Sequence, residues 1–367
     1  MGNKINKKNQ KKQKKNYNRN IDVIIPAYNV PDEIIFRCLA SIACQDIASE
    51  LKVTIIDDAS ETENYEKVAK CFSSVLDIEI LRYEENGGPG VARQYGIDHT
   101  SNGYITFIDA DDTFNGAFAL KALRNGIEMQ KGIYQMCVGV FDEVHEEGVP
   151  NGDGPILMAH EHDMVWMFGK LYRRNFIDKY KIKFHETSRA NEDNGFNTIC
   201  RLCSNDQEQI NFIPAHVYYW HENPNSITRA NDCQYSFGSS NRDSFYGYVE
   251  NMIYAIKEAK KRNPYNGGIL AWAVNCMLNI YEYYIECVER APEHADGNLQ
   301  WCKRYYDEIY TDIADDITDE ILAQHYNDVM RNAYMGDKLN GIIPCMSIFE
   351  FLDKLENFEE DNNEEEE

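Results

Sequence analysis

The stretch ITFIDADDTF at residues 105–114 joins an apolar run to three carboxylates, Asp109, Asp111 and Asp112. Ile, Thr and Phe are typical of a buried β-strand. Three acids at the tip of such a strand repel one another unless something positive lies beside them. The stretch therefore predicts a buried strand that ends at a site for a positively charged group.

Three further apolar runs precede this strand: IDVIIPAY at 21–28, LKVTIIDDAS at 51–60 and DIEILRYEEN at 77–86. Amphipathic stretches with helical spacing lie between them, for example residues 33–44 and 64–76. Strands that alternate with helices are typical of a mostly parallel sheet flanked by helices, and strands apolar on both faces fit that burial. The pattern predicts an α/β fold whose ligands bind beyond the carboxyl ends of the strands.

The chain changes character near residue 236. GGILAWAVNCMLNIYEYYIECVER at 267–290 reads as a long amphipathic helix that begins just after Gly267 and Gly268. We therefore predict a mainly helical C-terminal region over residues 236–355. Its apolar and aromatic residues are too many to face water, so we expect the helices to dock on the α/β domain and to offer a surface for a homo-oligomer.

Both ends of the chain are strongly charged. The first 20 residues carry only positive charges, and the last nine, EEDNNEEEE, carry seven negative ones. We predict a disordered basic tail over residues 1–19 and a disordered acidic tail over residues 356–367. The net charge of −24 argues against a nucleic-acid partner.

Composition favours a soluble protein of the cytoplasm. Hydrophobic residues make up 43% of the 367 and charged residues 27%, as in ordinary globular domains. No apolar run reaches the roughly 18 residues of a membrane-spanning helix, and the basic start lacks the apolar segment of a secretory signal. The 11 cysteines are scattered, and the odd number favours reduced thiols. Cys200 and Cys203 form a lone CxxC, which is not predicted to bind metal because no second pair accompanies it.

Asp109 and Asp111 are spaced so that both can point at one hard cation. Mg²⁺ and Mn²⁺ take oxygen ligands and are commonly held by one or two carboxylates together with substrate phosphates. The alternative is an Asp-rich turn that caps a helix. The pattern taken alone does not decide between them.

ENGGPGVARQYGI at residues 85–97 is a glycine-rich turn that opens a helix carrying Arg93. Glycines allow close backbone approach, and a helix N-terminus favours an anion. No GK[ST] follows, so a Walker-type phosphate loop is excluded. A purely structural turn is the alternative.

Glu192 and Asp193 begin another predicted helix, in SRANEDNGFNTI at 188–199. They either compensate the helix dipole or supply a general base to the ligand site beyond the strand ends. His221, within VYYWHENPNSIT at 217–228, is either a third metal ligand or a packed side chain among aromatic residues.

The order of these motifs is more specific than any one of them. The motifs are, in chain order, VIIPAYN, IIDDAS, ENGGPGVARQYGI, ITFIDADD, FGKLYRRNFI, NEDNGF and YYWHENPNSIT. They follow one another as in the inverting glycosyltransferase family 2, which the chain resembles over about residues 20–230. The resemblance implies a GT-A fold, which we place at residues 20–235, and a UDP-sugar or other nucleotide-sugar donor. The nucleotide-sugar-binding residues that it implies are Pro26, Ala27, Tyr28, Asn29, Asp58, Arg93, Asp109 and Ala110.

The resemblance also implies roles for the acids. Asp109 and Asp111 match the family's DxD, which binds the diphosphate through Mn²⁺ or Mg²⁺, with Asp111 as the more direct ligand. Asp193 matches the second acid of the family's ED motif and would be the base that deprotonates the acceptor hydroxyl in a single inverting displacement. His221 stays a candidate metal ligand, although the family often has Arg where Trp220 and His221 stand.

Two other hypotheses for the function stay open. A nucleotidyltransferase on a related fold also uses paired acids and a metal, but the basic glycine-rich loop that it needs near the N-terminus is missing. A non-catalytic module that binds carbohydrate or a protein partner is disfavoured because both acid motifs are intact. The acceptor, whether glycan, protein or modified nucleobase, is not indicated by the sequence.

Overall fold

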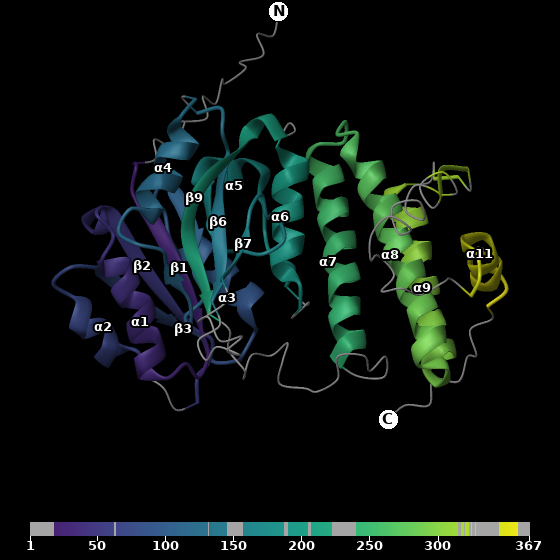
Figure 1. Ribbon diagram of the computed structural model, residues 1–367, viewed down its shortest axis with the longest axis horizontal. Helices are drawn as coiled ribbons and strands as arrows, with labels where there is room; N and C mark the ends of the chain where they lie inside the picture. Colours follow the sequence, from purple (N-terminus) through teal and green to yellow (C-terminus); the bar gives the residue numbers. More distant parts are fainter. Residues whose placement is uncertain are drawn as a thin grey trace, which may run out of the picture.

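The fold places a sheet domain at one end of the molecule and a group of helices at the other (Figure 1). The computed structural model describes residues 18–61, 64–130, 132–144, 157–186, 190–204, 207–221, 240–314, 317–318, 320–322, 324, 327 and 345–358. Most of the two predicted tails, residues 1–17 and 359–367, lies outside these ranges.

The described strands form one nine-stranded sheet in the order β3-β2-β1-β4-β8-β6-β9-β5, with β7 paired to β6. The strands β3, β2, β1 and β4 run parallel, β6 and β9 also pair in parallel, and the other pairs are antiparallel. Their bounds are β1 Ile21–Ala27, β2 Leu51–Asp57, β3 Asp77–Arg82, β4 Tyr104–Phe107, β5 Thr113–Phe114, β6 Met136–Val144, β7 Leu157–His160, β8 Lys170–Arg173 and β9 Ile210–His221.

Helices cover the sheet and continue beyond it. Those of the sheet domain are α1 Asp32–Ala43, α2 Glu66–Phe72, α3 Pro89–His99, α4 Ala119–Glu128, α5 Arg174–Tyr180 and α6 Glu192–Cys203, with short turns η1 Ala48–Glu50 and η2 Gln207–Gln209. The C-terminal region holds α7 Ser240–Arg262, α8 Gly268–Arg290, η3 Pro292–His294, α9 Ala295–Glu308, the π-helical turn η4 Ile309–Ile313 and α11 Ile348–Glu356.

The predicted fold class is confirmed. The four predicted strands correspond to β1 to β4, the two predicted helical stretches to α1 and α2, and the helix after Gly267 to α8. The sheet is parallel where the apolar runs alternate with helices, and mixed over the later strands, where aromatic and charged residues are interleaved.

Strand register brings the polar loops to one edge of the sheet. Ala27 at the end of β1 pairs with Asp57 at the end of β2, and Ile24 pairs with Phe107 at the end of β4. Since these strands are parallel, the loops that follow them begin side by side. The polar residues that follow the apolar runs therefore lie at the same sheet edge, where ligands are predicted to bind.

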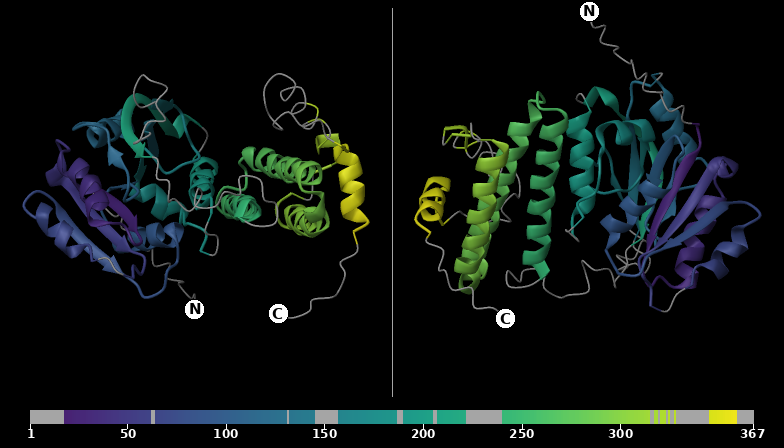
Figure 2. Two further views of the ribbon diagram at one scale, coloured as in Figure 1. Left: turned by 60° about the horizontal axis from the view of Figure 1, so that its bottom comes forward. Right: turned by 180° about the vertical axis from the view of Figure 1, so that it is seen from behind.

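Alternate residues of β1 enter two separate cores. Val23 and Ile25 pack with α1 and α4 on one face of the sheet, whereas Ile24 packs with α3 on the other. The second core continues without a break through α6, α7, α8 and α9 to α11, where Phe351 is fully buried. The predicted docking of the C-terminal helices on the sheet domain is therefore confirmed, and Figure 2 shows these helices side by side from two further directions.

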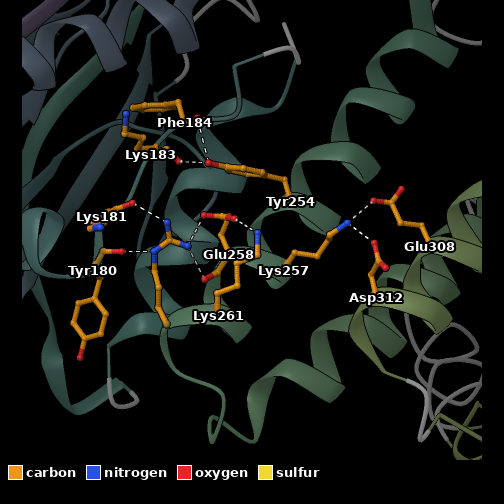
Figure 3. Close-up of polar contacts among 11 residues, drawn as sticks. Tyr180, Lys181, Lys183, Phe184, Tyr254, Lys257, Glu258, Lys261, Glu308 and Asp312 are labelled. Atoms are coloured by element: carbon orange, nitrogen blue, oxygen red, sulfur yellow. Dashed lines mark hydrogen bonds and ion pairs between the residues drawn. The ribbon is translucent and has the colours of Figure 1, made fainter.

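Helix α7 makes polar contacts on both of its sides (Figure 3). Toward the sheet domain, Arg262 donates to the Lys181 carbonyl at 3.0 Å. Toward the other helices, Lys257 Nζ lies 3.1 Å from Glu308 Oε1 and also pairs with Asp312. Helix α7 thus links the segment before α6 to the rest of the helical region.

Helix α7 also approaches α6 very closely. A Cβ atom on Gly195 of α6 would lie only 2.9 Å from Asn251 Oδ1 of α7. Asn251 Nδ2 in turn donates to the Ala190 carbonyl at 2.7 Å, just before α6 begins.

None of the helices within the described ranges combines the length and apolarity needed to cross a bilayer.

Candidate active site

The loops after β1 and β2 are tied to each other. The Asn29 backbone N–H donates to Ser60 Oγ at 2.9 Å, and Asn29 Oδ1 accepts from the Glu61 N–H at 2.8 Å. Asn29 and Ala59 have positive φ values of 52° and 60°, a conformation that costs energy for a residue with a Cβ. The two loops are therefore held together at the sheet edge, and Tyr28, beside Asn29, is 44% exposed.

Other predicted nucleotide-binding residues are less accessible. Ala27 and Ala110 are buried and Pro26 is partly buried, so they can present backbone atoms more readily than side chains. The buried Asp58 accepts the Gly87 N–H at 2.7 Å and the Gly88 N–H at 2.8 Å. Its carboxylate thereby fixes the glycine turn that leads into α3. Asn86 Nδ2 also donates to Asp58 Oδ2 at 3.2 Å, so that oxygen already has two donors. The predicted part of Asp58 in nucleotide binding stays a prediction.

Asp112 anchors the acidic turn. It is fully buried, and its two oxygens accept from the Tyr218 hydroxyl at 2.6 Å and from the His221 N–H at 2.8 Å. Burial, together with the charges of Asp111 and Asp109, raises the pKa of Asp112 well above its usual range. Strand β9 therefore holds the turn through Asp112, a structural role that the sequence pattern did not distinguish from those of the other two acids.

Arg93 joins the acidic turn to the start of α6. Its guanidinium donates to Asp109 Oδ1 and to Glu192 Oε1, each at 2.6 Å. Burial alone would lower the pKa of Arg93, but the carboxylates of Asp109 and Glu192 raise it above its ordinary value. The three side chains come from α3, the end of β4 and the start of α6, so one buried cation fixes the geometry of all three elements.

Asp193 differs from its neighbour Glu192 in its contacts. Its Oδ1 accepts the Asn194 N–H of its own helix at 2.8 Å, whereas Glu192 is paired with Arg93. Burial and the charge of Glu192 raise the pKa of Asp193 to about 7, against the opposing effects of Arg93 and that hydrogen bond. A carboxylate with a pKa near the working pH is suited to take up and release a proton.

The three predicted metal ligands are not alike in this structure. Asp109 is 30% exposed and shares one oxygen with Arg93, and the backbone carbonyl of Asp111 accepts from Arg37 at 2.6 Å. His221 Nε2 lies 2.9 Å from Thr113 Oγ1, and burial, with help from Arg37, lowers the pKa of His221 to about 4. Its imidazole is therefore neutral, as metal binding requires, but its role as a ligand stays a prediction.

Within the described residues, no group of three or more His, Cys, Asp or Glu side chains is arranged to hold an ion. The donor set at the acidic turn is limited to hard carboxylate oxygens. Mg²⁺ and Mn²⁺ are commonly bound by one or two carboxylates, with phosphate and water oxygens completing the shell. Asp109 and Asp111 therefore fit an ion that is held partly by its substrate.

Several residues of the site were not singled out by the sequence. Arg37 and Tyr218 support the acidic turn from α1 and β9, and the buried Lys170 pairs with Asp163 at 3.1 Å next to it. Arg37 lies inside an ordinary amphipathic helix, and its spacing carries no signal. Lys170 stands in the FGKLYRRNFI motif, where a lysine in an apolar strand was the available clue.

Comparison with known proteins identifies the class of domain. Residues 22–189 match the family model "Glycosyl transferase family 2". This chain therefore carries a glycosyltransferase family 2 domain, and the resemblance proposed from the motifs is confirmed.

Two curated relatives are similar to this chain. "Uncharacterized glycosyltransferase EpsJ" of Bacillus subtilis is 25% identical over 221 residues, which cover 57% of this chain and 62% of that protein. "Poly(ribitol-phosphate) beta-glucosyltransferase" of Bacillus spizizenii is 26% identical over 247 residues, or 65% of this chain and 37% of the relative. The chain thus spans less than two thirds of the length of either relative.

The fold also resembles a solved structure. The crystal structure of S. aureus TarS 1–349 has a TM-score of 0.59 and 20% sequence identity, covering 79% of this chain and 81% of that one. The coverage extends beyond the family 2 domain, so part of the helical region has a counterpart in that fold. The same protein in complex with UDP-GlcNAc has a TM-score of 0.56.

Proposed function

We propose that this protein is an inverting glycosyltransferase that moves a sugar from a UDP-sugar to an acceptor hydroxyl, with Asp193 as the general base. The observation that carries the proposal is the bridge made by Arg93, whose guanidinium lies 2.6 Å from both Asp109 and Glu192. The bridge brings the acidic turn, suited to a diphosphate and its cation, next to the helix that bears Asp193.

Each acid has a distinct part in the proposed reaction. The acceptor hydroxyl gives its proton to an Asp193 carboxylate oxygen and attacks the anomeric carbon from the face opposite the nucleotide. The C–O bond to the diphosphate breaks in the same displacement, so the configuration at the anomeric carbon inverts. Asp109 and Asp111 would hold Mn²⁺ or Mg²⁺, which supplies positive charge to the departing diphosphate. Glu192 keeps Arg93 in place and takes up no proton.

The donor is proposed to lie along the loops after β1 and β2. Tyr28 presents an exposed ring there, and Asp58 orders the glycine turn on which the nucleotide would rest. The UDP-GlcNAc complex of TarS, a protein of similar fold, supports uridine as the nucleotide.

We further propose a cytoplasmic enzyme with a carbohydrate-like acceptor. All ten cysteines in the described part of the chain are free thiols, as a reducing compartment would leave them. The relative named for poly(ribitol-phosphate) glucosylation supports a glycan or polyol-phosphate acceptor over a protein or a nucleobase.

The helical region is proposed to position the base, in addition to shaping acceptor choice or self-association. Asn251 of α7 holds the Ala190 carbonyl, three residues before Asp193, and is itself almost fully buried. A chain that ends at Asp232 would lose this contact. We expect it to be less soluble and to transfer no sugar, and a monodisperse truncated chain with unchanged transfer would refute this role.

A donor screen tests the proposed function. The protein is incubated with UDP-, GDP- and other nucleotide-sugars, with Mn²⁺ or with excess EDTA, and released nucleotide is measured. We expect release from a UDP-sugar that needs the divalent ion, with an unchanged melting temperature in EDTA. Release of pyrophosphate from a nucleoside triphosphate and a sugar phosphate would favour a nucleotidyltransferase, and no release from any donor would favour a binding module.

A further inference from the structure

The loop at residues 161–169 lies at the same sheet edge as the acidic turn. Strand β8, which follows it, runs antiparallel to β4, with Tyr172 opposite Ile105. Thr106 Oγ1 also donates to the Lys170 carbonyl at 2.7 Å. Because β8 begins where β4 ends, the loop that leads into Lys170 stands beside the acidic turn.

Buried polar groups hold this loop in one conformation. Lys170, with no exposed surface, donates to Asp163 Oδ1 at 3.1 Å and to the Phe168 carbonyl at 3.2 Å. Asp163 Oδ1 also accepts the N–H groups of Val165 at 3.1 Å and Trp166 at 3.0 Å. Burying a lysine costs free energy unless its charge is paired. The pair formed by Lys170 and Asp163, with the hydrogen bonds around it, therefore orders the loop.

Helix α6 holds the same loop from its other side. The fully buried Asn197 donates through Nδ2 to the Val165 carbonyl at 3.0 Å and to the Trp166 carbonyl at 2.9 Å. Asn197 is four residues after Asp193 and therefore lies on the same side of α6. The backbone of Trp166 is thus bonded to a residue that lies one helical turn from the proposed base.

A row of aromatic rings runs from this loop to the acidic turn. Trp166 stacks on Phe168 with centroids 6.1 Å apart and an interplanar angle of 11°, and Phe168 stacks on Tyr218 at 5.0 Å and 21°. Tyr218 is the residue that holds Asp112. The inner rings are buried, but the Trp166 side chain is 42% exposed.

We propose that Trp166 is an acceptor-binding residue whose exposed indole face packs on the C–H face of a sugar or polyol unit beside Asp193. The π-face of an indole is electron-rich and attracts the weakly positive C–H hydrogens of a pyranose or polyol, while the hydroxyl groups at its rim stay free to react. This inference rests on the proposed function and names the residue that would hold its carbohydrate-like acceptor.

Binding without turnover tests the inference. Chitotetraose, maltotetraose and poly(ribitol phosphate) are titrated into the full-length protein with UDP and Mn²⁺ present, and UDP-GlcNAc is titrated separately. We expect the wild type to bind at least one carbohydrate probe, Trp166→Ala to weaken that binding at least ~10-fold, and Trp166→Phe to restore most of it. The affinity for UDP-GlcNAc should change less than about threefold.

Tyr265→Ala is the matched control, because Tyr265 is a 96% exposed aromatic residue in the turn between α7 and α8. It should leave binding of the probe unchanged. Unchanged probe binding in Trp166→Ala, or binding of none of the probes by the wild type, overturns the inference. A loss confined to UDP-GlcNAc also overturns it and assigns Trp166 to the donor. Nucleotide release by the wild type, measured separately, shows whether the proposed function itself holds.

Discussion

The acidic turn at residues 109–112 and the acidic start of α6 at residues 192–193 look alike in the sequence, but their carboxylates are held differently. In the turn, Asp112 is buried against Tyr218. On α6, Glu192 is paired with Arg93. Each cluster therefore contains one acid committed to structure and a neighbour, Asp111 or Asp193, to which we assign a part in the proposed reaction.

Several carboxylates can stay close together only if their charges are compensated, because Coulomb repulsion among them would be severe in a partly buried site. One buried cation, Arg93, compensates Asp109 and Glu192 together, and the hydrogen bonds to Asp112 hold a third acid. Asp193 is left with a pKa of about 7. The paired acid Glu192 thus helps to raise the pKa of its neighbour Asp193.

Removing the shared cation should have the largest effect on stability. Arg93→Met leaves Asp109 and the buried Glu192 without their partner, so we expect the free energy of unfolding to fall by about 3–5 kcal/mol. Denaturant unfolding at pH 7.5 measures it. The matched control is Arg124→Met, which breaks a pair at 2.6 Å with the more exposed Glu50 and should cost about 1 kcal/mol. Equal losses in the two variants would contradict the bridging role of Arg93.

Two of the three acids of the turn, Asp111 and Asp112, should respond in opposite ways. Asp111→Asn keeps the shape of the side chain but weakens a ligand for a hard cation, so turnover at limiting Mn²⁺ should fall by more than ~10²-fold with little change in melting temperature. Asp112→Asn cannot satisfy both Tyr218 and the His221 N–H in the same way, and it should lower the melting temperature while the folded fraction keeps most of its activity. Near wild-type rates in Asp111→Asn would remove that residue from the metal site.

Much of this arrangement could be predicted from the sequence, because parallel strands end at one edge of a sheet. The strands through Ala27, Asp57 and Phe107 and the acids that follow them were visible as apolar runs with polar ends. The paired start of α6 was visible as well, since acids favour a helix N-terminus.

The pairing of the buried acids could not be predicted, because it depends on contacts between residues far apart in the sequence. Arg93 and Glu192 are 99 positions apart, and Asp112 and Tyr218 are 106 apart. No local spacing links such pairs. The loop that carries Trp166 was missed for another reason: its order comes from a buried lysine and from Asn197 on α6, and neither produces a periodic pattern.

Stability should depend on pH through Asp193. Its folded pKa of about 7 lies above the unfolded value of about 3.9. The unfolded chain therefore releases this proton first, and the contribution of Asp193 lowers the free energy of unfolding as pH rises from about 4 to about 7. Asp193→Asn removes this contribution and should be more stable than the wild type at pH 8, on the order of 2 kcal/mol after solvent screening. Denaturant unfolding at pH 5 and pH 8 measures the difference, and a variant less stable than the wild type at pH 8 would contradict the raised pKa.

The smallest expected effect belongs to Glu192→Gln. Its amide oxygen can still accept from Arg93, but the charge that helps to raise the pKa of Asp193 is gone. The pH at which kcat/KM reaches half of its plateau should therefore move below that of the wild type, with a loss of at most about 10-fold at pH 8. An upward shift would contradict the effect of the Glu192 charge on Asp193, and a collapse of the rate at every pH would assign the base to Glu192.

We propose above all that Asp193 removes the acceptor proton while other residues bind the donor. The direct measurement is transfer by Asp193→Asn with the donor and acceptor on which the wild type works, together with calorimetric affinities for UDP and Mn²⁺. We predict that transfer falls by ~10²–10⁴-fold while both affinities stay within a few-fold of wild type. An asparagine at this helix start satisfies the backbone about as well as an aspartate. Transfer at the wild-type rate would contradict the claim.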